Sequence, residues 1–286
     1  MTRTPMTRTR FLPLFGLALA ASAAQAQDLG AQAAQVLQRR APSIVTVKIV
    51  LKTEINVMGQ TQEREERIQV QGVVVDAGGL IMFSNSAISA AQLQEALSDM
   101  MDDEGQPGGF EIKTTPSDIK VVVGEEDTEH PAFLAASDDR LDLAFVQLQE
   151  LGELKLVAVD FPEAGAPKVG QTIIVVSRLN EGYDYAPYFE TGLIAGEIKT
   201  PQPAFVVAGQ AATVGLPVFA PSGEVLGVLT VVASGMRPQG GGLMQAMGGE
   251  SPMAQAFRPF VLPSGQVRAV VAQAKERAAE AAKQGR

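Results

Sequence analysis

The sequence predicts an all-β protein, a barrel or a sandwich, with a short helix near each end. The first observation is a series of short segments rich in Val and Ile, several of them separated by turn signals such as Ala-Gly-Gly at 77–79 and Pro-Ser-Gly at 221–223. The second is that few helical periods lie between these segments. The third is a composition of 46% hydrophobic and 19% charged residues, which suits a globular chain with one large or two small β domains.

The segments expected as strands are residues 44–51, 67–75, 119–123, 142–148, 172–176, 205–207 and 225–232. A helix is expected over 28–38, where Asp28 caps its start and Pro42 ends it. A second helix follows Ser264, and its apolar side is formed by Val267, Val270, Val271, Ala274 and Ala278.

Two further stretches differ in composition from the segments expected as strands. Residues 89–104 carry Leu and Met at helical spacing, and Ser89 with Gln92 forms a candidate capping box, which predicts an inserted helix lying on the barrel. Residues 235–252 combine repeated Gly with Met and predict a flexible loop.

The N-terminus has the pattern of a secretory signal peptide. Three arginines, an apolar run over 11–21 and the small-residue signal Ala24-Gln25-Ala26 predict residues 1–26 as the signal, with cleavage after Ala26. The run is too short to span a bilayer comfortably, so no membrane span is expected in the mature chain. The protein is therefore expected to be exported, as a periplasmic or secreted protein.

Composition excludes several chemistries. The chain has no Cys and one His, which removes disulfides, thiolate catalysis and Cys-based or paired-His metal sites. No P-loop or dinucleotide-binding turn is present, so neither a metal nor a cofactor is expected. Removing residues 1–26 takes away three arginines and no acids, so the formal charge of −9 becomes −12. An acidic surface without Trp argues against nucleic acid as a partner.

Several segments, in order, resemble the HtrA-type trypsin-like serine proteases. The similar segments are residues 72–75, 79–88, 141–146, 170–176, 190–196, 213–218, 223–228 and 260–264. Together they extend over roughly residues 41–275, and their shared order is more specific than any one of them.

This resemblance implies a two-barrel trypsin-like (chymotrypsin) fold with short N- and C-terminal helices. The expected domains are an N-terminal helix and first barrel over 27–158, a second barrel over 159–236, a flexible loop over 237–255 and a C-terminal segment and helix over 256–286. The PDZ domain that often follows in the family is expected to be missing, because the sequence ends at Arg286.

The same resemblance implies a degenerate catalytic triad. The family's histidine aligns with Ser86, its aspartate with Asp142 and its serine with Val214. A serine hydroxyl has no useful basicity near neutral pH, and valine has no nucleophilic atom. The oxyanion loop aligns with Ala212 and Gly215, and alanine disfavours a positive φ there.

Two further residues, Asp142 and His130, bear on whether a catalytic triad is present. Asp142 is expected as a partly buried carboxylate held by local hydrogen bonds. The single histidine, His130, lies just before an expected strand and outside all the triad segments, which predicts a surface or turn residue.

The leading hypothesis is a catalytically inactive homologue, or pseudoprotease, of the cell envelope that binds an extended peptide or protein partner as an added strand. The alternative is an active endopeptidase with a rearranged site, in which Ser84 or Ser86 pairs with a lysine, although neither loop contains one. A second alternative is a structural or assembly protein, in which the C-terminal helix or residues 89–104 hold a homo-oligomer.

Overall fold

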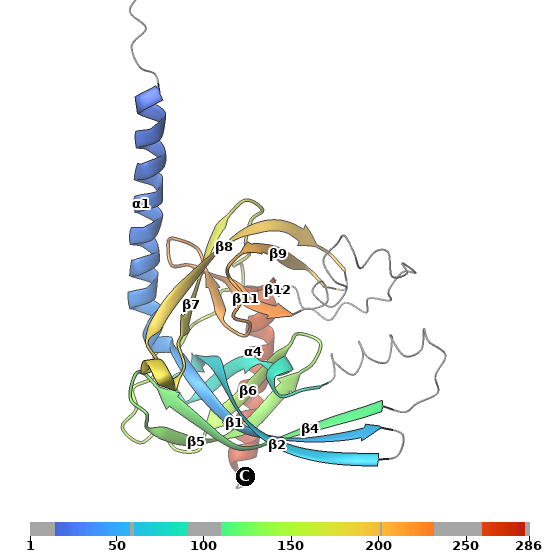
Figure 1. Cartoon of the computed structure of the whole chain (residues 1–286). Helices are drawn as coiled ribbons and strands as arrows, with labels where there is room; N and C mark the ends of the chain where they lie inside the picture. Colours follow the sequence, from blue (N-terminus) through green and yellow to red (C-terminus); the bar gives the residue numbers. More distant parts are fainter. Residues whose placement is uncertain (1–14, 58–59, 91–109, 201, 232–258, 284–286) are drawn as a thin grey trace, which may run out of the picture.

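The computed structural model describes residues 15–57, 60–90, 110–200, 202–231 and 259–283. Within them the chain forms two closed antiparallel barrels of six strands each, with a helix at either end (Figure 1). The predicted all-β, two-barrel fold with terminal helices is confirmed. The inserted helix predicted over 89–104 and the loop predicted over 235–252 fall mostly or entirely outside the described residues.

The first barrel closes in the order β1-β2-β3-β6-β5-β4. Its strands are β1 (Ile44–Val57), β2 (Gln60–Asp76), β3 (Leu80–Ser84), β4 (Phe110–Val123), β5 (Glu129–Asp138) and β6 (Leu143–Leu148). The pairing of β1 with β2 continues to Val57 and Gln60, well beyond the apolar run that predicted β1. On β2 the extension, residues 60–66, consists of polar and charged residues, which apolar patterning alone does not detect.

The second barrel closes in the order β10-β11-β12-β9-β8-β7. Its strands are β7 (Thr172–Arg178), β8 (Pro187–Ile198), β9 (Ala204–Gly209), β10 (Pro217–Phe219), β11 (Val225–Val231) and β12 (Pro259–Pro263). Strand β12 pairs with both β11 and β9. The second barrel therefore extends beyond residue 236, where the sequence prediction ended it, because a strand distant in sequence closes it.

The core shows how the two barrels are joined. Ile81 and Phe83 of β3 point into the first barrel, whereas Leu80 and Met82 belong to a larger cluster that includes the interior of the second barrel. Both faces of β3 are thus buried, which is why its sequence is an uninterrupted apolar run.

The N-terminal helix differs from its prediction. Helix α1 (Phe15–Arg40) runs through Asp28, so the prediction that Asp28 caps its start is wrong. The preceding residues are mostly Ala and Leu, the strongest helix formers, and continue the helix. The predicted stop is confirmed, because Pro42 lies in the short 3₁₀ helix η1 (Ala41–Ser43) that follows.

The C-terminal helix α4 (Ser264–Lys283) begins at Ser264, one residue before the predicted start. Its buried side chains Val267, Val271, Ala274 and Ala278 join the cluster that contains the second-barrel core. Across the described parts of the chain, no helix has the length and apolar character needed to cross a membrane.

Candidate functional site

The candidate site centres on Asp142, in the turn between β5 and β6. Its φ of 55° lies in the left-handed region, which aspartate tolerates better than most residues. The residue is fully buried. A buried carboxylate requires hydrogen-bond donors, and the surrounding strands supply them.

Two donors come from the first barrel. The Ser84 hydroxyl donates to Asp142 Oδ2 at 2.7 Å, and the Ser86 backbone N–H donates to Oδ1 at 2.6 Å. Strand β3 pairs with β6 so that Ser84 lies opposite Leu143. This register brings the end of β3 and the 3₁₀ helix η2 (Asn85–Ala87) beside the Asp142 turn.

Two more donors come from β11 of the second barrel. The Thr230 hydroxyl lies 2.9 Å from the carbonyl of Leu141 and 3.3 Å from Asp142 Oδ2, and the Val231 N–H lies 3.3 Å from the same oxygen. We call Ser84, Ser86, Asp142, Thr230 and Val231 the Asp142 cluster. The structure thus brings Ser86 to Asp142, and it adds a connection between the barrels.

Burial controls the acidity of Asp142. Removal from water raises the pKa of the Asp142 carboxyl, while the hydrogen bonds from Ser84, Ser86 and Val231 act in the opposite direction. The carboxylate is therefore held by neutral donors in a site that disfavours its charge.

The two serine hydroxyls form a short chain that ends on this carboxylate. Ser86 Oγ lies 2.7 Å from Ser84 Oγ, which in turn donates to Asp142. Ser86 is half-buried, whereas Ser84 is buried. In an active serine protease an imidazole is hydrogen-bonded to this carboxylate. Here the nearest side chain that donates to Asp142 is a serine hydroxyl, which is a very weak base.

The loop that contains Val214 lies directly against β3. At Gly215, with a φ of 85°, an added Cβ would lie 3.0 Å from the carbonyl carbon of Phe83 and would also meet the backbone nitrogen of Ser84. Only glycine suits such an approach. The half-buried Val214 immediately precedes Gly215, so the structure brings the loop to the same region as Ser84 and Asp142.

A carboxylate from β8 holds the first part of this loop. The backbone N–H groups of Ala212 and Thr213 donate to Glu190 Oε2 at 2.8 and 3.4 Å, and the Thr213 hydroxyl donates to Oε1 at 2.9 Å. Ala212 is absent from the described non-glycine residues with positive φ. The predicted conflict between alanine and a positive φ therefore does not arise in this loop conformation.

His130 lies outside these elements. It is the second residue of β5, half-buried and opposite Val121 of β4. The expectation that it precedes the strand is therefore wrong. No group of three or more His, Asp or Glu side chains among the described residues is arranged to hold a metal ion.

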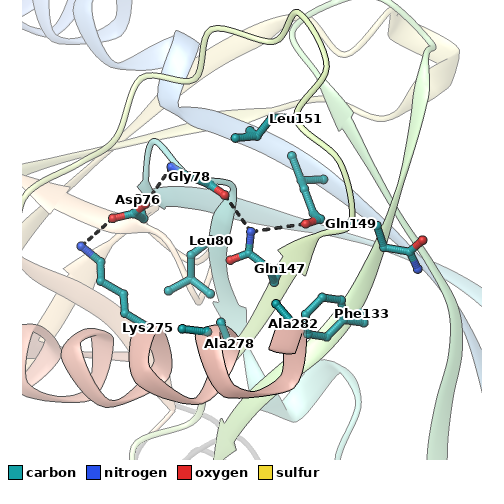
Figure 2. Close-up of a pocket in the computed structure, with 12 residues that line it drawn as sticks. Asp76, Gly78, Leu80, Phe133, Gln147, Gln149, Leu151, Lys275, Ala278 and Ala282 are labelled. Atoms are coloured by element: carbon teal, nitrogen blue, oxygen red, sulfur yellow. Dashed lines mark hydrogen bonds and ion pairs between the residues drawn. The ribbon is translucent and has the colours of Figure 1, made fainter. Parts of the chain in front are cut away.

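A cavity of about 710 Å³ lies elsewhere, between α4 and the ends of β2, β3 and β6 (Figure 2). Asp76 and Lys275 form a 2.8 Å ion pair at its wall, and Gln147 donates to the carbonyl of Gly78 at 2.7 Å. Its lining includes no residue of the Asp142 cluster, so it is separate from the candidate site.

Sequence reasoning missed Glu190 and Thr230. Both lie in strand segments with no local motif, and their roles depend on contacts with residues 23 and 88 positions away. A lone glutamate beside Thr191-Gly192 in a β segment gives no signal that it will bind a backbone loop.

Comparison with known proteins identifies the family. A family model described as a trypsin-like peptidase domain matches residues 70–228, more than half of the chain. No curated protein matches the chain. The matched region includes β3, the Asp142 turn and the 212–215 loop, and the two six-stranded barrels agree with the match. The chain therefore belongs to the trypsin-like peptidase domain family.

Proposed function

We propose that this protein is a pseudoprotease of the HtrA type, a trypsin-like barrel pair of the cell envelope that binds an extended peptide or protein segment without cleaving it. The observation that carries the proposal is the Asp142 cluster, in which the carboxylate receives hydroxyl and backbone donors from Ser84, Ser86 and Thr230. No imidazole takes part in this hydrogen-bond set.

Chemistry supports inactivity at each position. At Ser86, where the family has its histidine, a hydroxyl is too weak a base to activate a nucleophile. At Val214, where the family has its serine, the side chain offers only methyl groups. The Ala212 amide, which would stabilise an oxyanion, donates instead to Glu190.

Asp142 has a structural role in this proposal. Its carboxylate joins β3 and η2 of the first barrel to β11 of the second through the hydrogen bonds of the Asp142 cluster. Such a joint is useful to a two-barrel scaffold with or without catalysis. This role explains why an aspartate remains where the other two triad residues do not.

Peptide binding is supported by the fold and its mode of recognition. Trypsin-like barrels bind substrates as an added strand through backbone hydrogen bonds, and that mode does not require the triad. The support is fold-level analogy, because function depends on the site rather than on the fold.

The test is binding without turnover. The purified protein is incubated with a library of extended peptides, captured and analysed by mass spectrometry. We expect a subset of peptides to be retained at full length. Cleaved peptides that disappear in an Asp142→Ala variant, or no retained peptide at all, would contradict the proposal.

Export is a separate part of the proposal. Three arginines, the apolar run over 11–21 and the Ala24-Gln25-Ala26 signal support cleavage after Ala26. N-terminal sequencing of the protein recovered from its native cell is expected to begin at Gln27. A first residue of Met1 would overturn the export signal.

The hydroxyl chain favours one competing function, an active hydrolase that uses Ser86. Ser86 Oγ is half-buried and linked through Ser84 Oγ to a buried carboxylate whose pKa is raised. We place this second, because each Asp142 oxygen already accepts other donors and an intervening hydroxyl weakens proton transfer.

A further inference from the structure

The loop at Ala212 and Thr213 is a formed carboxylate site. Glu190 Oε2 accepts both backbone N–H groups, and Oε1 accepts the Thr213 hydroxyl at 2.9 Å and the Tyr188 hydroxyl at 3.2 Å. Four neutral donors thus converge on the two oxygens of one carboxylate. Consecutive backbone amides of this kind form anion-binding concavities.

The site is open to an outside ligand. Ala212 is exposed, and Thr213, Tyr188 and Glu190 are half-buried. Glu190 is on β8, and its side chain reaches the loop across 22 residues of sequence. Rotation of the Glu190 side chain would therefore free these hydrogen-bond donors without moving either barrel.

We propose that residues 212–213 form a carboxylate-binding site that Glu190 fills in the free protein and that a carboxylate of the bound peptide takes over. The takeover rests on the proposed peptide-binding function, whereas the site itself does not. The partner class is a segment that ends in a free C-terminal carboxylate, since backbone amides capture such termini in peptide-recognition proteins.

The first test uses acetate and does not require a peptide partner. In Glu190→Ala, backbone amide signals of Ala212 and Thr213 are followed by NMR with selectively labelled protein during titration with sodium acetate. We expect these two signals to shift with acetate in the variant, and to stay in place in the wild type, whose site is filled. Unmoved signals in the variant would overturn the site.

The matched control is Glu197→Ala, a change of the same type on the same strand at an exposed position. Acetate is expected to leave the two signals in place in this variant. A shift equal to that in Glu190→Ala would show that acetate acts through net charge, and would overturn the assignment. In the Glu190→Ala background, Thr213→Val removes one hydroxyl donor and is expected to weaken acetate binding.

The second test concerns the takeover. A fluorescein-labelled hexapeptide of alternating valine and threonine is compared with its C-terminal amide by fluorescence anisotropy. In Glu190→Ala we expect the free carboxylate to bind about tenfold more tightly than the amide, since hydrogen bonds to a charged acceptor are stronger than those to a neutral one. In the wild type the preference is expected to be smaller.

The outcomes separate the two proposals. Equal binding of carboxylate and amide to Glu190→Ala would overturn the carboxylate partner while leaving peptide binding in place. Binding of neither form to any variant would contradict the peptide-binding function and the takeover together. The acetate titration tests the site in either case.

Discussion

Two of the polar groups that join the barrels do so by opposite means. The Asp142 cluster is buried and uses neutral donors. The other group, which we call the Lys48 clasp, consists of Lys48, Asp127, Glu129, Glu181 and Tyr185. Lys48 Nζ lies 2.9 Å from Asp127, 3.0 Å from Glu129 and 3.4 Å from Glu181, and the Tyr185 hydroxyl donates to Asp127 at 2.7 Å.

The two groups differ in their exposure to solvent, and this exposure determines how much each contributes to stability. The side chains of Asp127 and Glu181 in the clasp are 56% and 54% exposed, so solvent screens their ion pairs. Asp142 is shielded from solvent, and each of its donors would lose a hydrogen bond if the carboxylate were removed. The Asp142 cluster is therefore expected to be the stronger connection between the barrels.

The largest effect is expected for Asp142→Ala. Removal of the carboxylate leaves the Ser84 hydroxyl and the amides of Ser86 and Val231 without their acceptor, which we expect to lower the free energy of unfolding by about 3–4 kcal/mol. Urea denaturation measures this change. The control is Asp160→Ala, at an exposed aspartate outside the Asp142 cluster; equal losses for the two variants would refute a special role for Asp142.

The next largest effect is expected for Arg178→Met. Arg178 is buried and donates to the carbonyls of Ile44, Tyr185 and Ala41 at 2.7–2.9 Å, so the variant leaves three acceptors unpaired. We expect a loss of about 2–3 kcal/mol in urea denaturation. Arg277→Met, at an exposed arginine of α4, serves as the control. A loss no greater than that of the control would contradict the role of these three hydrogen bonds.

The sequence predicts more of the barrels than of the joints between them. Apolar runs such as 172–176 are recognisable as strands from their own residues. A buried strand needs apolar side chains whichever strand it pairs with. Strand β12 is a barrel strand only because it pairs with β9 and β11, and nothing within its own five residues indicates that pairing. Long-range pairing is the information that local patterns lack.

In the candidate site, too, some residues are predictable from the sequence and others are not. The resemblance brought Ser86, Asp142 and the 212–215 loop to attention, because each follows a recognisable strand or turn. Thr230 and Glu190 contribute single side chains from strands, so only the folded geometry reveals them. The prediction for Asp142 underestimated its burial, because its β11 donors come from a distant part of the chain.

The pH dependence of stability is expected to differ in sign between the two groups. The raised pKa of Asp142 means that the folded state holds its proton more tightly, so this contribution to stability falls as pH rises from the ordinary carboxyl range toward the raised pKa. The pKa of Asp127 is lowered by hydrogen bonds from Tyr185 and Lys48. That of Glu129 is lowered by Lys120 and Lys48. Their contribution is present above the ordinary carboxyl pKa and is lost as pH falls through the lowered pKa.

Urea midpoints between about pH 3 and pH 7 measure this contrast. Asp142→Asn is expected to remove the component that falls with rising pH, and Lys48→Met to reduce the component that rises with it. If Asp142→Asn leaves the profile unchanged, the Asp142 carboxyl does not titrate differently in the folded state.

The smallest effect is expected for Glu181→Gln. Its carboxylate is exposed and forms the longest of the three Lys48 ion pairs, together with a 3.4 Å hydrogen bond from the Gln69 amide. We expect a change within about 0.5 kcal/mol, decreasing further in 0.5 M salt. A loss comparable to that of Asp142→Ala would reverse the ranking of the two joints.

The most direct measurement of the central claim is labelling with a serine-reactive fluorophosphonate, read as intact mass. With a hydroxyl at Ser86, valine at 214 and the Ala212 amide bound to Glu190, we expect no gain of mass after prolonged incubation, while an active trypsin-like protease in the same tube is labelled. Stoichiometric labelling of one serine, mapped to Ser86 and abolished in Asp142→Asn, would contradict the pseudoprotease assignment and establish a rearranged hydrolase.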